Sequence, residues 1–204
     1  MNTPKPFVIG ITGTIGSGKS AVGSILEEMG IPVIDTDKVV HELFEDETPV
    51  KRAVIERFGK TILDMSGQNI DRKKLGEIIF ADEGGRKDLE SIVHPAVILD
   101  TRRRVALNTD KELVAVLSPL LFEANVQDEY DQVWAIIASE AVLRERLSRR
   151  DNLSAELITQ RLRAQFSQEK KASLANVTID NSGTKEETKR QVEVNLDKLR
   201  AVIR

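Results

Sequence analysis

The sequence predicts an α/β protein in which a parallel sheet of five strands is flanked by helices. Short apolar segments of strand-like composition alternate along the chain with longer segments that have helical periodicity. This alternation is typical of parallel sheets whose strands are joined by right-handed helical crossovers. The chain has 204 residues, of which 40% are hydrophobic and 31% are charged, as expected of one globular domain with a small insert.

Five segments have the length and composition of buried strands in a parallel sheet. In chain order they are Phe7–Thr12, Ile31–Asp35, Glu112–Leu117, Val133–Ala138 and Asn176–Asp180. Helical periodicity follows the first, fourth and fifth of them, over Ser20–Met29, Ala141–Arg150, Ala155–Leu174 and Glu186–Ile203.

Between the second and third strands, the stretch from Lys38 to Asn108 has helical periodicity and no strong strand. Glycine, proline or serine interrupts this periodicity at Pro49, Gly59, residues 66–67, residues 84–85 and Pro95. We expect a helix to break at each of these places. The stretch is therefore predicted to form a helical insert, over about residues 38–111.

Composition excludes several classes of function. The net charge of −3 lacks the basic footprint of a nucleic-acid-binding protein, so we expect no nucleic-acid partner. The absence of cysteine excludes disulfides, thiolate chemistry and cysteine metal sites. The first residues do not have the pattern of a secretory signal, and no apolar run approaches membrane-spanning length. We therefore predict a cytoplasmic protein without a membrane partner.

The stretch from Gly13 to Ser20, GTIGSGKS, matches the phosphate-binding pattern G-x-x-x-x-G-K-[ST], with a predicted strand before it and a predicted helix after it. Glycines let backbone N–H groups approach an anion without interference from Cβ atoms, and the helix N-terminus adds positive potential. Lys19 is expected to reach the β- and γ-phosphates, and the Ser20 hydroxyl to bind Mg²⁺. The sequence therefore predicts a P-loop that binds a nucleoside triphosphate.

Among P-loop proteins, a small-molecule kinase fits the chain best. A GTPase would normally carry an N-K-x-D element for its base, and none occurs. Motor and assembly ATPases usually have an acidic pair at the end of a hydrophobic strand, whereas Ser118 and Pro119 follow the strand at 112–117. Two alternatives stay open, which are a kinase for another small hydroxylated or nucleotide acceptor and a non-catalytic nucleotide-dependent switch.

Two aspartates, Asp35 and Asp37, follow the second predicted strand. They are expected at the carboxyl edge of the sheet, where ligands of open parallel sheets bind. A carboxylate there could orient or deprotonate an acceptor hydroxyl, or one aspartate could simply N-cap the helix that starts near Lys38. We favour the functional role for Asp37 and leave both roles open for Asp35.

Several arginines gather in the second half of the chain. Arg146 and Arg150 are four residues apart, on one face of a predicted helix, and Arg161 follows in a polar helical segment. Arginines carried by a closing lid can stabilise the charge of a transferring phosphoryl group. The alternative is a solvated charged face, which we favour for Arg149 and Arg163 taken singly.

Six features stand in order along the chain, which are the P-loop, DTD, HPAV, PLLFE, the Arg146/Arg150 pair and IDNSG. With the stretches around them, such as VIDTDKVVHEL, NIDRKKLGEIIF and VTIDNSG, they resemble the dephospho-CoA kinase family from Val8 to about Leu199. The P-loop is shared by many enzymes, whereas D-x-D combined with H-P and PLLFE is much more specific. The resemblance implies ATP-dependent phosphorylation of the ribose 3′-hydroxyl of dephospho-CoA, which gives coenzyme A and ADP.

The resemblance also implies how the chain is divided. It suggests one P-loop kinase domain, similar to nucleotide monophosphate kinases, with its core at residues 7–37, 112–150 and 176–204. The insert at about 38–111 would bind the CoA part of the substrate, and residues of about 151–175 would form a lid. We expect a monomer or a small homo-oligomer.

The family pattern assigns roles to individual residues. Asp37, Lys19 and Arg146 match catalytic positions, Ser20 matches the Mg²⁺ ligand, and Gln165 lies with Arg161 in the lid pattern R-x-x-x-Q. The residues expected to bind ATP are Thr14, Ile15, Gly16, Ser17, Gly18, Lys19, Ser20, Ala21, Arg146, Arg150, Asn181, Ser182 and Gly183. The residues expected to bind dephospho-CoA are Asp37, His41, His94, Pro95, Leu121, Glu123 and Arg161.

Three of these residues also have a plain structural interpretation. His41 lies one helical turn after Asp37 and is either a substrate contact or an exposed helix histidine. His94 precedes a proline and is better suited to capping or packing than to acting as a base. Glu123 either accepts a hydrogen bond from the substrate or stabilises the turn at 120–125.

Overall fold

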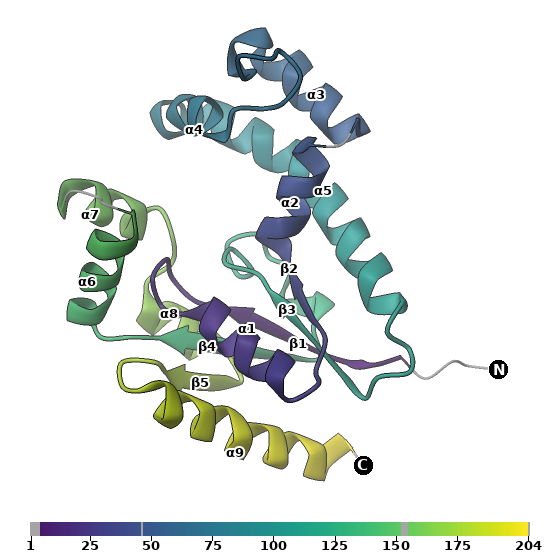
Figure 1. The fold of residues 1–204 in the computed structure, drawn as a ribbon, viewed down its shortest axis with the longest axis vertical. Helices are drawn as coiled ribbons and strands as arrows, with labels where there is room; N and C mark the ends of the chain where they lie inside the picture. Colours follow the sequence, from purple (N-terminus) through teal and green to yellow (C-terminus); the bar gives the residue numbers. More distant parts are fainter. Residues whose placement is uncertain (1–4, 46, 152–154, 204) are drawn as a thin grey trace. The chain divides into compact units, whose positions relative to one another are not determined.

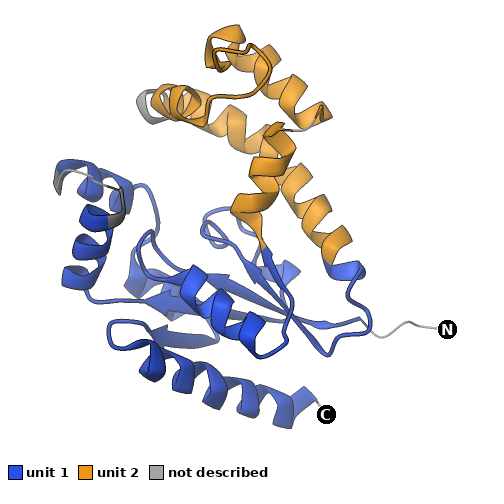
Figure 2. Cartoon of the chain, in the orientation of Figure 1, with its two compact units in different colours: residues 1–34, 105–204 blue, residues 35–104 orange. Residues whose placement is uncertain are grey.

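The computed structural model describes residues 5–45, 47–151 and 155–203 of the chain. The chain forms two compact units, which Figure 2 colours separately. Unit 1 consists of residues 1–34 and 105–204, and unit 2 consists of residues 35–104.

A parallel sheet of five strands, ordered β2-β3-β1-β4-β5, lies at the centre of unit 1 (Figure 1). The strands are β1 (Phe7–Thr12), β2 (Val33–Asp35), β3 (Leu113–Leu117), β4 (Gln132–Ile137) and β5 (Val177–Asp180). β1 is the middle strand and pairs in parallel with β3 and β4, as Gly10 opposite Val116 and Val133 illustrates. All five residues of β3 are buried, as expected of a strand covered on both faces.

Helices pack against this sheet because their apolar sides match its buried faces. The helices of unit 1 are α1 (Lys19–Glu28), α6 (Glu140–Asp151), α7 (Ala155–Arg163), α8 (Gln168–Leu174) and α9 (Lys185–Ile203), with a short 3₁₀ turn, η2, at Gln127–Glu129. One core cluster joins Ile25 of α1 and Leu196 of α9 to the strand residues Ile11 and Trp134. A second, smaller cluster contains Leu121, Phe122 and Val133, with Phe166 packed against it.

Unit 2 is helical and has a core of its own. It consists of α2 (Thr36–Glu45), α3 (Pro49–Phe58), the 3₁₀ turn η1 (Lys60–Ile62), α4 (Arg72–Ala81) and most of α5 (Glu83–Ala106). Its buried core residues are Phe44, Val54, Ile62, Ile70, Leu75 and Val93. Each such side chain contributes about 1.5–3 kcal/mol when it is fully buried, so the unit is stabilised by its own apolar contacts.

Two predicted helix breaks in unit 2 are wrong. α5 continues through Pro95, and Val93 and Val97 on either side of it pack in the same core. A break there would lose these apolar contacts, and that loss would cost more than the one backbone hydrogen bond that proline removes. α5 also contains residues 84–85, and the break lies instead at Asp82, whose Oδ1 accepts a hydrogen bond from the Gly84 N–H at 2.9 Å.

The expected break at Pro49 is confirmed, since α3 begins there, and so is the break at Gly59, which ends α3 with a φ of 79°. The single helix predicted over Ala155–Leu174 is wrong, because α7 ends at Arg163 and α8 begins at Gln168. The Ser167 side chain accepts a hydrogen bond from the Lys170 N–H, and this N-cap defines the start of α8. Among the described residues, no helix has both the length and the apolar character to cross a membrane.

Candidate active site

The P-loop connects the end of β1 to the start of α1, as its sequence context predicts. Gly16 and Gly18 have φ angles of 83° and 95°, which favour glycine over any residue with a side chain. A Cβ atom on Gly18 would also lie 1.8 Å from Nδ2 of Asn181. Glycine is therefore required at position 18 both by the backbone angle and by the close approach of a neighbouring side chain.

The ammonium group of Lys19 lies over the P-loop. Its Nζ donates hydrogen bonds to the carbonyl oxygens of Gly13 at 2.9 Å and of Thr14 at 3.3 Å. The loop is closed beneath it by a hydrogen bond from the Ser17 N–H to the Thr14 carbonyl at 3.1 Å. A positive charge is therefore held beside the N-terminus of α1, which is the end of a helix that attracts phosphate.

Arg146 of α6 and Asn181, which follows β5, form a wall beside the P-loop. Arg146 Nη2 donates to the Asn181 carbonyl at 2.9 Å, and Nη1 of the same side chain lies 3.4 Å from the Ser17 carbonyl. The buried Asn181 side chain donates from Nδ2 to the Ser17 carbonyl at 2.8 Å. Two segments that are distant from the P-loop in the sequence are therefore hydrogen-bonded to one turn of it.

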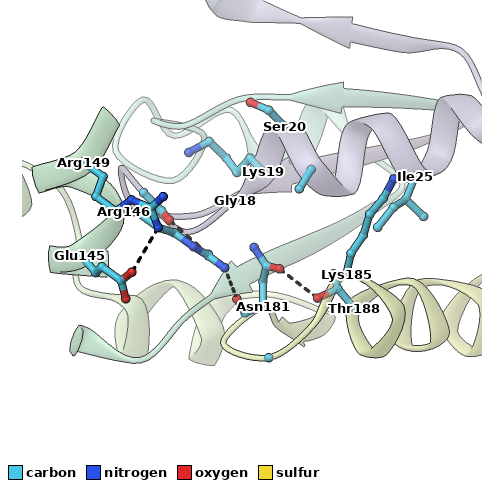
Figure 3. A pocket seen from close by; sticks show the side chains of 13 residues that line it. Gly18, Lys19, Ser20, Ile25, Glu145, Arg146, Arg149, Asn181, Lys185 and Thr188 are labelled. Carbon is cyan, nitrogen blue, oxygen red and sulfur yellow. Dashed lines mark hydrogen bonds and ion pairs between the residues drawn. The ribbon is translucent and has the colours of Figure 1, made fainter. Parts of the chain in front are cut away.

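A cavity of about 640 Å³ opens beside this wall, and Figure 3 shows the side chains that line it. Four of the lining residues carry a positive charge, namely Lys19, Arg146, Arg149 and Lys185. Among the described side chains that line it, Glu145 is the one acidic residue, and it pairs with Arg149 at 3.4 Å. The cavity is therefore suited to a ligand with several negative charges, and Arg149, for which we favoured a solvated face, belongs to its lining.

The other residues predicted to bind ATP have varied surroundings. Ser20 and Ala21 are exposed and line the cavity with Gly16 and Gly183. The hydroxyl of Ser182 accepts a hydrogen bond from the Ser139 N–H at 2.8 Å. The side chain of Arg150 lies outside the described part of the structure.

Two further P-loop residues have notable polar groups. The hydroxyls of Thr14 and Ser17 are buried, and neither has a hydrogen-bond partner among the described residues. The Ile15 N–H donates to Oε1 of Gln165 at 2.9 Å, so a residue from the linker between α7 and α8 contacts the P-loop directly. This contact engages one of the loop amides.

The residues that are present fit a magnesium ion held mainly by a nucleotide. In the described part of the chain, no cluster of three or more His, Asp or Glu side chains could hold a metal ion. Mg²⁺ usually keeps several waters and binds through substrate phosphates and one or two protein groups, so such a cluster is not required. The exposed Ser20 hydroxyl at the start of α1 is a suitable protein ligand.

Leu121 and Glu123, which the family pattern predicts as substrate contacts, have contacts within the core of unit 1. Leu121 is completely buried in the second apolar cluster. Glu123 forms an ion pair of 2.7 Å with Lys171, whose side chain is fully buried. Burial lowers the pKa of Lys171, and the neighbouring Glu123 carboxylate opposes this shift.

Arg161, which is also predicted to bind substrate, lies on α7 and is half-buried.

Lys171 carries no signal in the sequence that would have revealed its position. It stands in a charged helical stretch, QEKK, in which a solvated lysine is the ordinary expectation. Its burial depends on contacts with β1, with Pro119 and with Glu123, which lie 48 to 159 residues away in the chain.

The residues of unit 2 that are predicted to bind substrate lie on α2 and α5, and Asp35 lies at the end of β2. Asp35 accepts a hydrogen bond from the Asp37 N–H at 2.9 Å, so Asp35 acts as the N-cap of α2. Asp37 is exposed in the first turn of α2. His41, on the same helix, pairs with Glu45 at 3.1 Å. In α5, His94 is half-buried and Pro95 is exposed.

The strand, the glycine-rich loop with its lysine, and the basic cavity define a P-loop kinase fold. A solved shikimate kinase from Acinetobacter baumannii has the same fold, with a TM-score of 0.54 and 19% sequence identity over 96% of this chain and 94% of that one. A solved structure from Thermus thermophilus matches with a TM-score of 0.82 and 31% identity, over 95% of this chain and 98% of that one.

A more specific assignment comes from proteins with higher sequence similarity. The chain matches the dephospho-CoA kinase family over residues 7–187. It is 42% identical to the dephospho-CoA kinase of Geobacter metallireducens over 188 residues, which are 91% of this chain and 93% of that protein. A dephospho-CoA kinase structure from Campylobacter jejuni matches with a TM-score of 0.69 and 25% identity, over 94% of this chain and 96% of that one. The chain belongs to the dephospho-CoA kinase family.

Proposed function

We propose that this protein transfers the γ-phosphoryl group of ATP to the ribose 3′-hydroxyl of dephospho-CoA, which gives coenzyme A and ADP, the final step of coenzyme A synthesis. The observation that carries the proposal is family membership over residues 7–187, together with an intact P-loop beside a cavity that four cations line. A bare P-loop fold would support only nucleotide binding, because it hosts many functions.

Unit 1 supplies the ATP side of the reaction. The β- and γ-phosphates bind at the P-loop amides and Lys19, and Arg146 reaches the same turn of the loop from α6. Phosphoryl transfer spreads negative charge over the equatorial oxygens of the γ-phosphate, so fixed cations lower its barrier. Bound Mg²⁺ would neutralise the same charge, with the Ser20 hydroxyl as its protein ligand.

Asp37 supplies the acceptor side. Its carboxylate orients the 3′-hydroxyl and takes its proton while the hydroxyl oxygen bonds to the γ-phosphorus. The bond between that phosphorus and the β,γ-bridging oxygen breaks, and ADP leaves. Asp37 suits this role because it is exposed, and because Asp35 already serves as the cap of the helix. Unit 2, with His41 and His94, then provides the surface for the remainder of the substrate.

The test measures ADP release from ATP–Mg²⁺ with and without dephospho-CoA, and detects coenzyme A by mass. We expect ADP release that depends on dephospho-CoA. We also expect coenzyme A to form in an amount equal to that of ADP. ADP release with a different hydroxylated acceptor, and none with dephospho-CoA, would show that the protein phosphorylates that other acceptor. Tight ATP binding without stimulation by any small acceptor would indicate a nucleotide-dependent switch.

A further inference from the structure

Lys171 of α8 is a fully buried lysine that the proposed reaction does not use. Its Nζ donates to the Pro119 carbonyl and to Oε2 of Glu123, both at 2.8 Å. The hydroxyl of Thr12, the last residue of β1, lies 3.5 Å from the same nitrogen. The ammonium group is thus enclosed by oxygens where β1 passes into the P-loop, and it is not among the residues that line the cavity.

Glu123 connects Lys171 to the linker between α7 and α8. Its Oε1 accepts a hydrogen bond from the Phe166 N–H at 2.8 Å. Both carboxylate oxygens therefore have partners, because Oε2 is bound to Lys171. The backbone of the linker is held at this residue, one position after Gln165.

Gln165 completes the connection to the P-loop. Its Oε1 accepts the hydrogen bond from the Ile15 N–H at 2.9 Å. A continuous set of contacts therefore runs from Lys171 through Glu123 and the linker backbone to the turn of the loop that precedes Lys19.

The energetics of buried charges indicate that this pair has a role other than stability. Removing two charges from water is costly, and replacing a buried ion pair by apolar residues is often neutral or stabilising. An ion pair beside a binding loop, in which one carboxylate oxygen contacts the ammonium group and also accepts a hydrogen bond from the adjacent linker, is instead suited to fixing a geometry. A fixed position of the P-loop matters because a binding site gains affinity when its parts are held in place before the ligand arrives.

We propose that Lys171 is a positioning residue for nucleotide binding, which acts through Glu123 and Gln165 to hold the P-loop in its binding conformation. The inference rests on ATP as the nucleotide of the proposed reaction. The test is the binding of ATP–Mg²⁺ in the absence of acceptor. The positioning role can therefore fail while dephospho-CoA is still phosphorylated, and it can hold if dephospho-CoA is not the substrate.

The first experiment is a double-mutant cycle on the Kd for ATP–Mg²⁺, measured by calorimetry for the parent, Lys171→Met, Gln165→Leu and the double variant. Each single change is expected to raise Kd about fivefold, the size of one lost hydrogen bond. The double variant should bind no more weakly than either single one, because both changes interrupt the same series of contacts between Lys171 and the P-loop. Effects that multiply in the double variant would overturn the route through Gln165.

The second experiment separates positioning from stability. Lys198→Met makes the same side-chain change on an exposed face of α9, and it should leave Kd unchanged. Unfolding is followed by the fluorescence of Trp134, the one tryptophan in the sequence, which is fully buried. A Lys171→Met variant that unfolds more easily but binds ATP–Mg²⁺ as the parent does would show a structural role only, and would overturn the proposal.

A third variant serves if Lys171→Met does not fold. Lys171→Met combined with Glu123→Leu leaves no unpaired buried charge, so folding is expected, but the Phe166 N–H loses its acceptor. This variant should still bind ATP–Mg²⁺ about fivefold more weakly, and its KM for ATP should rise. Parent-like binding of ATP–Mg²⁺ in this variant would overturn the proposal.

Discussion

The hydroxyl of Thr188 donates a hydrogen bond to Oδ1 of Asn181 across 2.9 Å, and both residues are buried. Because an amide has one oxygen and one nitrogen, this contact decides which of them faces the P-loop. Nδ2 is directed to the Ser17 carbonyl, to which it donates at 2.8 Å. Thr188 of α9 therefore sets the orientation of a group that contacts the nucleotide-binding loop, although it is not itself part of that loop.

Thr188→Val is expected to weaken ATP binding severalfold. Valine has the same shape, but it leaves Oδ1 of Asn181 buried without a donor, which costs about 1–3 kcal/mol. The amide is then free to turn its oxygen toward the Ser17 carbonyl, where two acceptors would repel each other. Calorimetric titration with ATP–Mg²⁺ checks this result. Thr178→Val, the same change at an exposed position of β5, should bind ATP as the parent does, and equal weakening in both variants would contradict the role of Thr188.

Gly18→Ala is expected to abolish tight ATP binding and to lower stability. Its φ of 95° costs an alanine about 1–2 kcal/mol, and its Cβ would also clash with Asn181 Nδ2, at 1.8 Å. Gly30→Ala is a matched control, because Gly30 has a φ of 78° but no atom within 4 Å of its Cβ position. Thermal unfolding and ATP titration of both variants separate the effects. Gly30→Ala should lose only the stability that the strained backbone angle costs, and it should bind ATP normally. Intact ATP binding by Gly18→Ala would mean that the Asn181 contact is not needed.

The parts of the site that depend on consecutive residues could be predicted from the sequence. Gly13 to Ser20 form one loop, so a local pattern specifies both its backbone and its chemistry. The strands were also predictable, because apolar runs such as Phe7–Thr12 and Glu112–Leu117 have few other possible structures. These predictions depend on local propensity and burial, both of which are encoded in short segments.

The contacts that position the loop could not be predicted. Asn181 and Ser17 are 164 positions apart in the numbering, and Lys171 and Glu123 are 48 positions apart. A single sequence contains no signal for such pairs, since each residue is polar and would be expected at the surface. α5 illustrates the same limit, because packing on both sides of Pro95 overrides the local tendency of proline to end a helix.

Asp37→Asn is expected to bind ATP as the parent does and to lose turnover by about a hundredfold or more, the usual contribution of a general base. The amide keeps the size of the side chain but cannot accept the hydroxyl proton. ADP release under saturating dephospho-CoA checks the loss, and calorimetry checks that ATP binding is unchanged.

Asp35→Asn provides the comparison for Asp37, because it removes the same charge two residues away. Asparagine caps a helix as well as aspartate does, so α2 should keep its start and the variant should keep its turnover. An equal loss in both variants would mean that negative charge in this segment, rather than a base at Asp37, is what the reaction needs.

Tyr130 is expected to titrate well above the pH of an ordinary tyrosine. Burial, and then the negative charge of Glu129, raise its pKa from 10.0 to about 12, while a hydrogen bond with Ser118 partly opposes the shift. Tyr130 is the one tyrosine in the sequence, so the ultraviolet absorbance of tyrosinate reports on it alone. The midpoint should lie near 12 in the folded protein and near 10 in denaturant. A midpoint near 10 in both states would show that the ring is solvated.

The same shift predicts how stability changes in alkali. Between pH 10 and 12 the tyrosine of the unfolded chain has lost its proton while the folded protein still holds it, so the unfolded state binds fewer protons. The free energy of unfolding must therefore fall as pH rises through this window, and the full contribution of the group is present below pH 10. Tyr130→Phe removes the titrating group but keeps the ring that packs against Gly10. The variant should lose less stability than the parent between these two pH values, measured by denaturant unfolding, and parallel losses would assign the alkaline effect to lysine side chains instead.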